Sequence, residues 1–262
     1  GEDTLSLHDA LPILAVISLL LILAATISPP YAQPAEYHQF ADQRHFFGIP
    51  NFNDVISNLA FLLSGSAGLI LLWQVYRTPA QTLFHDIREA IPYVVLFMGV
   101  AIAAVGSMIY HWNPGIEHLM WDRLPIGISI TALLSATVFD RIHPRLGLWM
   151  LPVLVVLAVC SVLYWYWTEL QGRGNLNFYI VMQFYSIVLI AWISLVFPSR
   201  YAPDQAVFQV IALYGVAKIA ETLDAPIFVW TQGWISGHTL KHLIAAGAAY
   251  RIKQLLQQRQ RH

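Results

Sequence analysis

Residues 92–112 read PYVVLFMGVAIAAVGSMIYHW, an apolar run that contains no Asp, Glu, Lys or Arg. About 20 such residues in an α-helix cross the hydrocarbon core of a bilayer. The run ends with Ser107 and His111, and a polar side chain inside lipid costs free energy unless it has a partner or a task. This stretch therefore predicts a transmembrane helix that carries chemistry near one end.

The composition of the whole chain has the same character. Of its 262 residues 57% are hydrophobic and 11% are charged, against about 25% charged in an ordinary soluble domain. The mean hydropathy is +0.57, and the net charge of -1 argues against nucleic-acid binding. The single cysteine, Cys160, excludes a disulfide or a thiolate metal cluster within one chain. We expect an integral membrane protein.

Six further runs resemble the first and are separated by short connections rich in Pro, Gly and Asn. The seven predicted spans are 54–76, 92–112, 119–139, 146–167, 176–197, 206–224 and 236–256. The predicted fold is an all-α membrane protein, a bundle of seven transmembrane helices over residues 54–256. Residues 28–53 form an N-terminal segment outside the cytoplasm, and residues 257–262 a cytoplasmic tail.

Residues 1–27 form an additional N-terminal hydrophobic segment, either a signal peptide or an extra helix. Within it, residues 6–13 resemble translated vector sequence. Both readings of the segment leave the topology of the seven spans unchanged.

The positive charges predict the orientation, because cytoplasmic loops retain Lys and Arg. The more basic side carries Arg77, Arg88, Arg141, Arg145, Arg200, Arg251, Lys253, Arg259 and Arg261. The other side carries only Arg44, Arg123 and Arg173. We therefore expect a cytoplasmic C-terminus, in the cell membrane of a bacterium or in the endoplasmic reticulum or Golgi of a eukaryote.

Five polar residues fall at one predicted membrane depth. Ser107 and His111 are four apart, as are His238 and His242, so each pair shares a helix face. Asp122 opens the third span at the same level. Three neutral imidazoles with an open fourth position are typical of a catalytic zinc site, which predicts His111, His238 and His242 as metal ligands.

Other readings of these polar residues stay open. A membrane histidine can be a packing residue with a hydrogen bond, and paired membrane histidines can hold haem. In the sixth span Lys218, Glu221 and Asp224 lie at i, i+3 and i+6, which favours pairing of Lys218 with Glu221 over a role in binding a lipid headgroup.

The residues before and at the start of the first span are rich in oxygen ligands. The candidates for a calcium ion are Asp42, Asn51, Asn53 and Asp54. The same residues can instead form a turn in which Asn53 caps the first helix.

The set Ser107, His111, Asp122, His238 and His242, with the segment FNDVISNL at residues 52–59, resembles the alkaline ceramidase family. That family belongs to a superfamily of seven-helix membrane hydrolases that includes the adiponectin receptors. The resemblance covers about residues 36–256. It implies a zinc amidase whose metal is held by the three histidines. In this reading Asp122 transfers the proton from water to the amine, and Ser107 stabilises the oxyanion.

The resemblance also implies a substrate and a second ion. The expected reaction is hydrolysis of ceramide, or a related N-acyl lipid, to a sphingoid base or amine and a fatty acid. Animal members of the family bind calcium through more carboxylates than Asp42 and Asp54 offer. The rival functions are a seven-helix lipid-binding receptor with a structural zinc and a haem-binding membrane electron carrier.

Overall fold

The computed structural model describes residues 12, 16, 18–20, 22–23, 25–78, 83–202 and 206–261. In chain order the α-helices of the bundle are α2 (Phe52–Ser57), α3 (Leu59–Arg77), α4 (Ala90–Trp112), α5 (Ile116–Arg141), α6 (Pro144–Leu170), α7 (Asn177–Ile180), α8 (Ser186–Val196), α9 (Val207–Thr222), α10 (Asp224–Trp230) and α11 (Gly237–Gln258). The shorter elements are η1 (Ala35–His38), η2 (Ile87–Glu89), the π-helical turn η3 (Val181–Tyr185), β1 (Tyr201–Ala202) and β2 (Gln260–Arg261).

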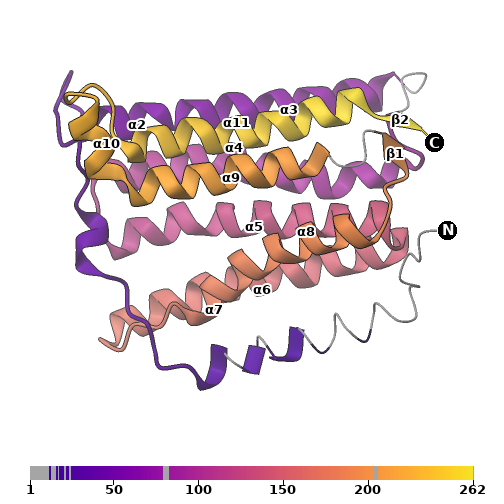
Figure 1. Cartoon of the computed structure of the whole chain (residues 1–262), viewed down its shortest axis with the longest axis horizontal. Helices are drawn as coiled ribbons and strands as arrows, with labels where there is room; N and C mark the ends of the chain where they lie inside the picture. The colour runs from indigo at the N-terminus through magenta and orange to yellow at the C-terminus, as the bar shows by residue number, and fades with distance from the viewer. Residues whose placement is uncertain are drawn as a thin grey trace.

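The helices lie side by side along the longest dimension of the molecule (Figure 1). Within the described residues, five helical stretches are long and apolar enough to cross a membrane. They are Phe52–Arg77, Ile87–Trp112, Ile116–Arg141, Pro144–Leu170 and Asn177–Val196. Large apolar side chains such as Leu63, Trp149 and Leu195 are exposed on their outer faces, where lipid rather than water suits them. The protein is thus all-α and membrane-embedded.

The other two predicted spans are helical but differ from these five. The helix α9 has 16 residues, and α11 includes Lys241, Arg251 and Lys253. The predicted sixth span also ends early, because the chain leaves α9 at Thr222 and begins the separate helix α10 at Asp224. The first span begins at Phe52 and is interrupted at Asn58, between α2 and α3.

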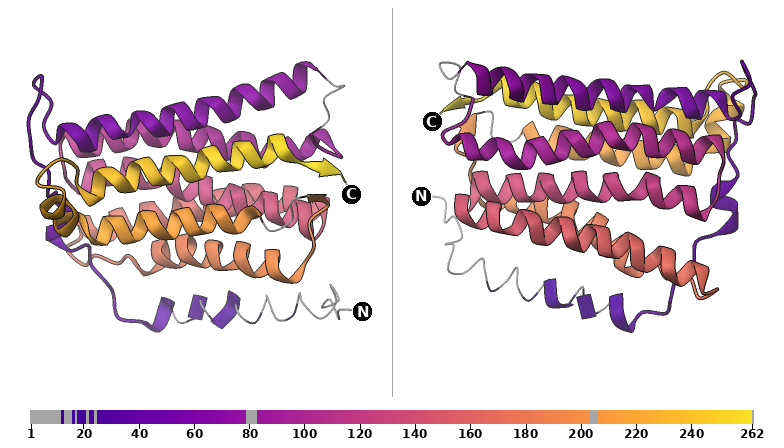
Figure 2. Two further views of the ribbon diagram at one scale, coloured as in Figure 1. Left: turned by 45° about the horizontal axis from the view of Figure 1, so that its top comes forward. Right: turned by 180° about the vertical axis from the view of Figure 1, so that it is seen from behind.

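The helix α3 packs against both α4 and α11 (Figure 2). The helix α4 also packs along α5, and a Cβ atom added at Gly106 would lie 2.3 Å from the carbonyl oxygen of Trp121. At Gly237 an added Cβ would lie 2.2 Å from the carbonyl oxygen of Ala220 in α9. These two contacts bring the end of α4 close to the start of α5, and the start of α11 close to the end of α9.

The two ends of the bundle differ. At one end, residues 28–51 run across the helix termini from the side of α6 and α7 to α2 (Figure 1). At the other end β1 pairs with β2 in a short antiparallel ladder, Tyr201 opposite Arg261.

Within the N-terminal segment 1–27, the structure describes residues 12, 16, 18–20, 22–23 and 25–27. Those between 18 and 27 are helical. The choice between signal peptide and extra helix stays a prediction.

Candidate metal centre

Three histidines from two helices meet inside the bundle. His111 lies in the last turn of α4, and His238 and His242 lie in the first two turns of α11. All three are buried, at 0%, 5% and 1% exposure respectively. One potential ligand atom from each lies within 4.8 Å of the others. No other group of at least three His, Cys, Asp or Glu within the described residues is so arranged.

The atoms that face each other fit a tetrahedral ion. Nε2 of His111 lies 3.3 Å from Nε2 of His238, and two nitrogens bound to one zinc at about 2.0–2.1 Å in tetrahedral geometry lie about 3.4 Å apart. Nε2 of His242 is buried and has no hydrogen-bond partner among the described residues. Three imidazole nitrogens suit zinc or another transition metal, whereas calcium prefers oxygen ligands.

The ring of His242 is held by the first helix of the bundle. Its Nδ1 lies 2.8 Å from the hydroxyl of Ser57 in α2, which leaves Nε2 toward the other imidazoles. Metal-bound histidines usually have such a partner on the second ring nitrogen, because it holds the ring in one orientation. Ser57 was not among the site residues predicted from the sequence. The signal that could have found it is its place in residues 52–59, the segment at the start of the first span that carries the family resemblance.

The backbones that carry the histidines are also held by polar contacts. The amide of Asn51 donates to the carbonyl of His111 at 2.8 Å. The first turn of α11 is fixed on two sides: Asp224 accepts from the backbone N–H of His238 at 2.8 Å, and Asp54 accepts from the hydroxyl of Thr239 at 2.5 Å. Ser236 caps this turn by accepting from the N–H of Thr239. The two helices that carry the histidines, α4 and α11, are thus held by contacts from α2, from the residue before it, and from α10.

Ser107 and Asp122 lie together beside this centre. Both are buried, and the Ser107 side chain lies close to the Asp122 carboxyl group. The close contact between α4 and α5 at Gly106 explains the pairing, since Gly106 precedes Ser107 and a Cβ added to it would lie 3.3 Å from the backbone nitrogen of Asp122. Ser107 is one turn before His111, so all five predicted residues gather at one end of the bundle.

Lys241, which was not predicted from the sequence as a site residue, joins these groups. The ammonium group of Lys241 lies 3.2 Å from Nε2 of His238 and 2.8 Å from the carboxylate of Glu221. Glu221 also pairs with Lys218, as the i, i+3 spacing predicted. Asp224, the third member of that predicted cluster, instead binds backbone N–H groups of His238 and Ala41. Lys241 was hard to identify because its partner Glu221 is on another helix.

The four calcium candidates are all engaged in hydrogen bonds within the protein. Asp42 pairs with Arg44 through both carboxylate oxygens, at 2.8 and 2.7 Å. Burial alone would raise the pKa of the Asp42 carboxyl, but hydrogen bonds from Arg44 and Asn53 outweigh it, so the net pKa is lowered. The prediction that Asn53 caps the first helix is wrong. Asn51 is the residue before α2, it makes no side-chain cap, and the amide of Asn53 binds Asp42.

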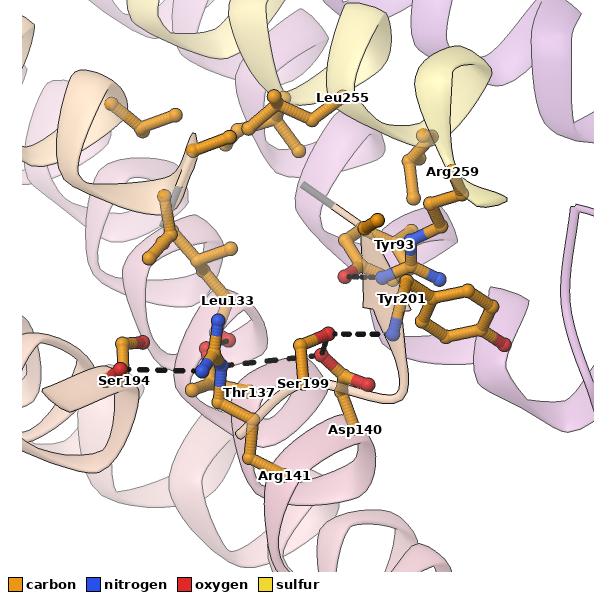
Figure 3. Close-up of a pocket in the computed structure, with 16 residues that line it drawn as sticks. Tyr93, Leu133, Thr137, Asp140, Arg141, Ser194, Ser199, Tyr201, Leu255 and Arg259 are labelled. Atoms are coloured by element: carbon orange, nitrogen blue, oxygen red, sulfur yellow. Dashed lines mark hydrogen bonds and ion pairs between the residues drawn. The ribbon is translucent and has the colours of Figure 1, made fainter. Parts of the chain in front are cut away.

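A second polar cluster lies at the opposite end of the bundle, around a small pocket (Figure 3). Figure 3 shows Arg141 reaching the carbonyl oxygen of Ser194 and Asp140 meeting Ser199. Arg259 pairs with Glu89 at 3.4 Å and donates to Tyr93 at 2.7 Å. These contacts join the end of α5 to the end of α8, and the residue after α11 to η2 and α4.

Comparison with known families found no family model that matches this chain, and no curated protein matches it. The metal centre therefore rests on the geometry of its own residues.

Proposed function

We propose that the protein is a zinc-dependent membrane amidase that hydrolyses the amide bond of a ceramide or a related N-acyl lipid. The observation that carries the proposal is the meeting of His111, His238 and His242 near the buried pair Ser107 and Asp122. Amide hydrolysis needs an activated water and a proton for the departing amine. The resemblance to the alkaline ceramidases adds support through the same five residues.

The chain's own groups have distinct tasks in this proposal. A zinc ion held by the three imidazoles would supply Lewis acidity and activate water at neutral pH. The carboxylate of Asp122 accepts a proton from the attacking water and returns it to the amine nitrogen as the C–N bond breaks. The hydroxyl of Ser107 donates a hydrogen bond to the carbonyl oxygen as it gains negative charge. The products are a fatty acid and an amine.

We further propose that α9 and α11 complete a bundle of seven transmembrane helices. The end with Arg141, Arg200 and Arg259 is then cytoplasmic, by the positive-inside rule. The metal centre lies at the opposite end, because His111 ends α4 and His238 begins α11. The substrate would reach it from the leaflet that faces away from the cytoplasm.

The test is turnover by purified, zinc-loaded protein in detergent with a long-chain ceramide, measured as free fatty acid. Wild type should release fatty acid, and Asp122→Asn should retain zinc but lose activity by at least about 100-fold, as expected for a general acid–base group. A lipid-binding receptor with a structural zinc would give no turnover in wild type. A haem protein would show a Soret absorbance band.

A further inference from the structure

A cavity of about 300 Å³ lies directly against Asp122, within the usual size range for ligand sites of roughly 300–1,000 Å³. Its walls come from residues 31–37 and from α5, α7, η3, α9 and α11. One part of the wall is apolar, with Ile126, Ile180 and Phe184. The charged residues of the wall are Asp122, Arg123, Lys218, Glu221 and Lys241.

The charges of the residues that line this cavity do not balance. Three of the wall residues are cations and two are anions, which leaves an excess of one positive charge. Glu221 is shared between Lys218 and Lys241. Glu169 lies outside the wall, and its carboxylate accepts from the backbone N–H of Gln33 and the indole N–H of Trp165.

Among the cations of the wall, Arg123 has a hydrogen-bond donor that lacks a partner. The residue is 6% exposed, and its NH1 group has no hydrogen-bond partner among the described residues. Its NH2 group donates to the side chain of Gln33 at 2.6 Å. The guanidinium is held over the rings of Trp165 and Tyr179, at 4.2 and 4.8 Å from their centres. A buried guanidinium with an unpaired donor is costly unless a buried water or a ligand supplies an acceptor.

We propose that this cavity binds an anionic group, carboxylate or phosphate, on the amine half of the N-acyl substrate. The amine half is the part placed there because Asp122, which lines the cavity, would return the proton to the leaving nitrogen. This inference rests on the proposed amidase function and adds that acidic N-acyl lipids are preferred to neutral ones such as ceramide. The unpaired donor of Arg123 and the excess positive charge are the two features that carry it.

The test compares binding of N-palmitoylglycine with binding of N-palmitoylglycinamide, which has the same acyl chain but no charge. Wild type should bind the acid at least about tenfold more tightly, as a charge-assisted hydrogen bond allows. Arg123→Gln should reduce this preference to less than about twofold. Arg173→Gln is the matched control, since Arg173 is exposed in the nearby loop after α6 and is not a wall residue.

Binding measured on metal-free protein shows whether Arg123 or zinc causes the preference for the acid. After chelation the preference for the acid should persist, and its disappearance would overturn the inference. Equal binding of the two lipids by wild type, or an unchanged preference in Arg123→Gln, would also overturn it. If Arg123→Gln does not fold, Lys218→Gln replaces it, because the Lys218 side chain is 38% exposed. A preference that does not fall at least about threefold in that variant then counts against the site.

Hydrolysis of the same two lipids distinguishes this inference from the proposed function. Acid preference in binding without hydrolysis of any N-acyl lipid supports the anion site and overturns the amidase. Hydrolysis of ceramide together with equal binding of the two test lipids supports the amidase and overturns the anion site.

Discussion

The hydroxyl of Ser57 lies 2.8 Å from Nδ1 of His242, and this contact joins the first helix of the bundle to the last. Residues 185 positions apart in the chain therefore set the orientation of one imidazole. Because the contact occupies Nδ1, Nε2 is the nitrogen left for an ion. The geometry of the candidate metal centre thus depends on Ser57, which is not one of its three histidines.

Replacing a ligand should remove the ion. We expect His242→Ala to contain no zinc, whereas wild type contains about one zinc per chain, since two imidazoles hold zinc far less tightly than three. Mass spectrometry of detergent-purified protein measures this. His45→Ala is the control, because His45 is exposed in the N-terminal segment. Full zinc content in His242→Ala would show that the site lies elsewhere.

Removing the hydrogen-bond partner of a ligating histidine should weaken zinc binding less than removing the histidine itself. We expect Ser57→Ala to lower zinc affinity by about 10- to 100-fold, the usual effect of losing a hydrogen bond to a ligating histidine. Competition with a chromophoric chelator measures the affinity. Ser64→Ala is the matched control, because Ser64 also joins α3 to α11, through the carbonyl of Ala246, without touching the histidines. Equal affinities in the two variants would contradict this role of Ser57.

The ion pairs of Glu221 should matter for stability. We expect Glu221→Gln to lower the free energy of unfolding by about 3–5 kcal/mol, because Lys241 would stay buried without its anion. Chemical denaturation in detergent measures the loss. The matched exposed pair is Asp86 with Arg88, where Asp86→Asn should cost less than about 1 kcal/mol. Similar losses in the two variants would argue against a buried charge at Lys241.

The contact between α4 and α5 should not tolerate a larger residue. We expect Gly106→Ala to destabilise the protein by about 1–3 kcal/mol, because its Cβ would overlap the backbone of Trp121. The same substitution at Gly247, where an added Cβ meets nothing within 4 Å, should be neutral or stabilising, since Ala favours helix. Thermal unfolding of both variants measures these changes in stability. An unchanged stability of Gly106→Ala would mean that α4 and α5 can move apart to accept the added Cβ.

The pair of Asp42 and Arg44 should make stability depend on pH. The pKa of Asp42 is lowered in the folded protein, so its stabilisation is complete above the unfolded value of about 3.9 and is lost as pH falls through the lower, folded pKa. Arg44→Gln should therefore lower Tm at pH 7 by about 2–4 °C, with a smaller difference from wild type near pH 3. Arg173→Gln serves as control. A difference in Tm that is independent of pH would contradict the pairing.

The burial of Trp165 and the ion pair of Lys241 could not be predicted from the sequence. Residues 164–167 read YWYW near a predicted helix end and favour an interfacial belt, and Trp167 is indeed exposed. Trp165 is instead fully buried, beneath the guanidinium of Arg123. Lys241 lies between two predicted ligands, yet only the position of α9 shows that it pairs with Glu221. Periodicity identifies a face of a helix but does not say which helix covers it.

The sequence by itself determined that the chain is helical and suited to lipid, and that His238 and His242 share one helix face. These are local properties, because they depend on side-chain hydropathy and on 3.6 residues per turn. The tertiary structure decided that His111 joins that pair, that Ser57 orients His242, and that Arg123 faces a cavity beside Asp122. Such relationships depend on which helices pack together, and here two glycines, Gly106 and Gly237, allow the close approach.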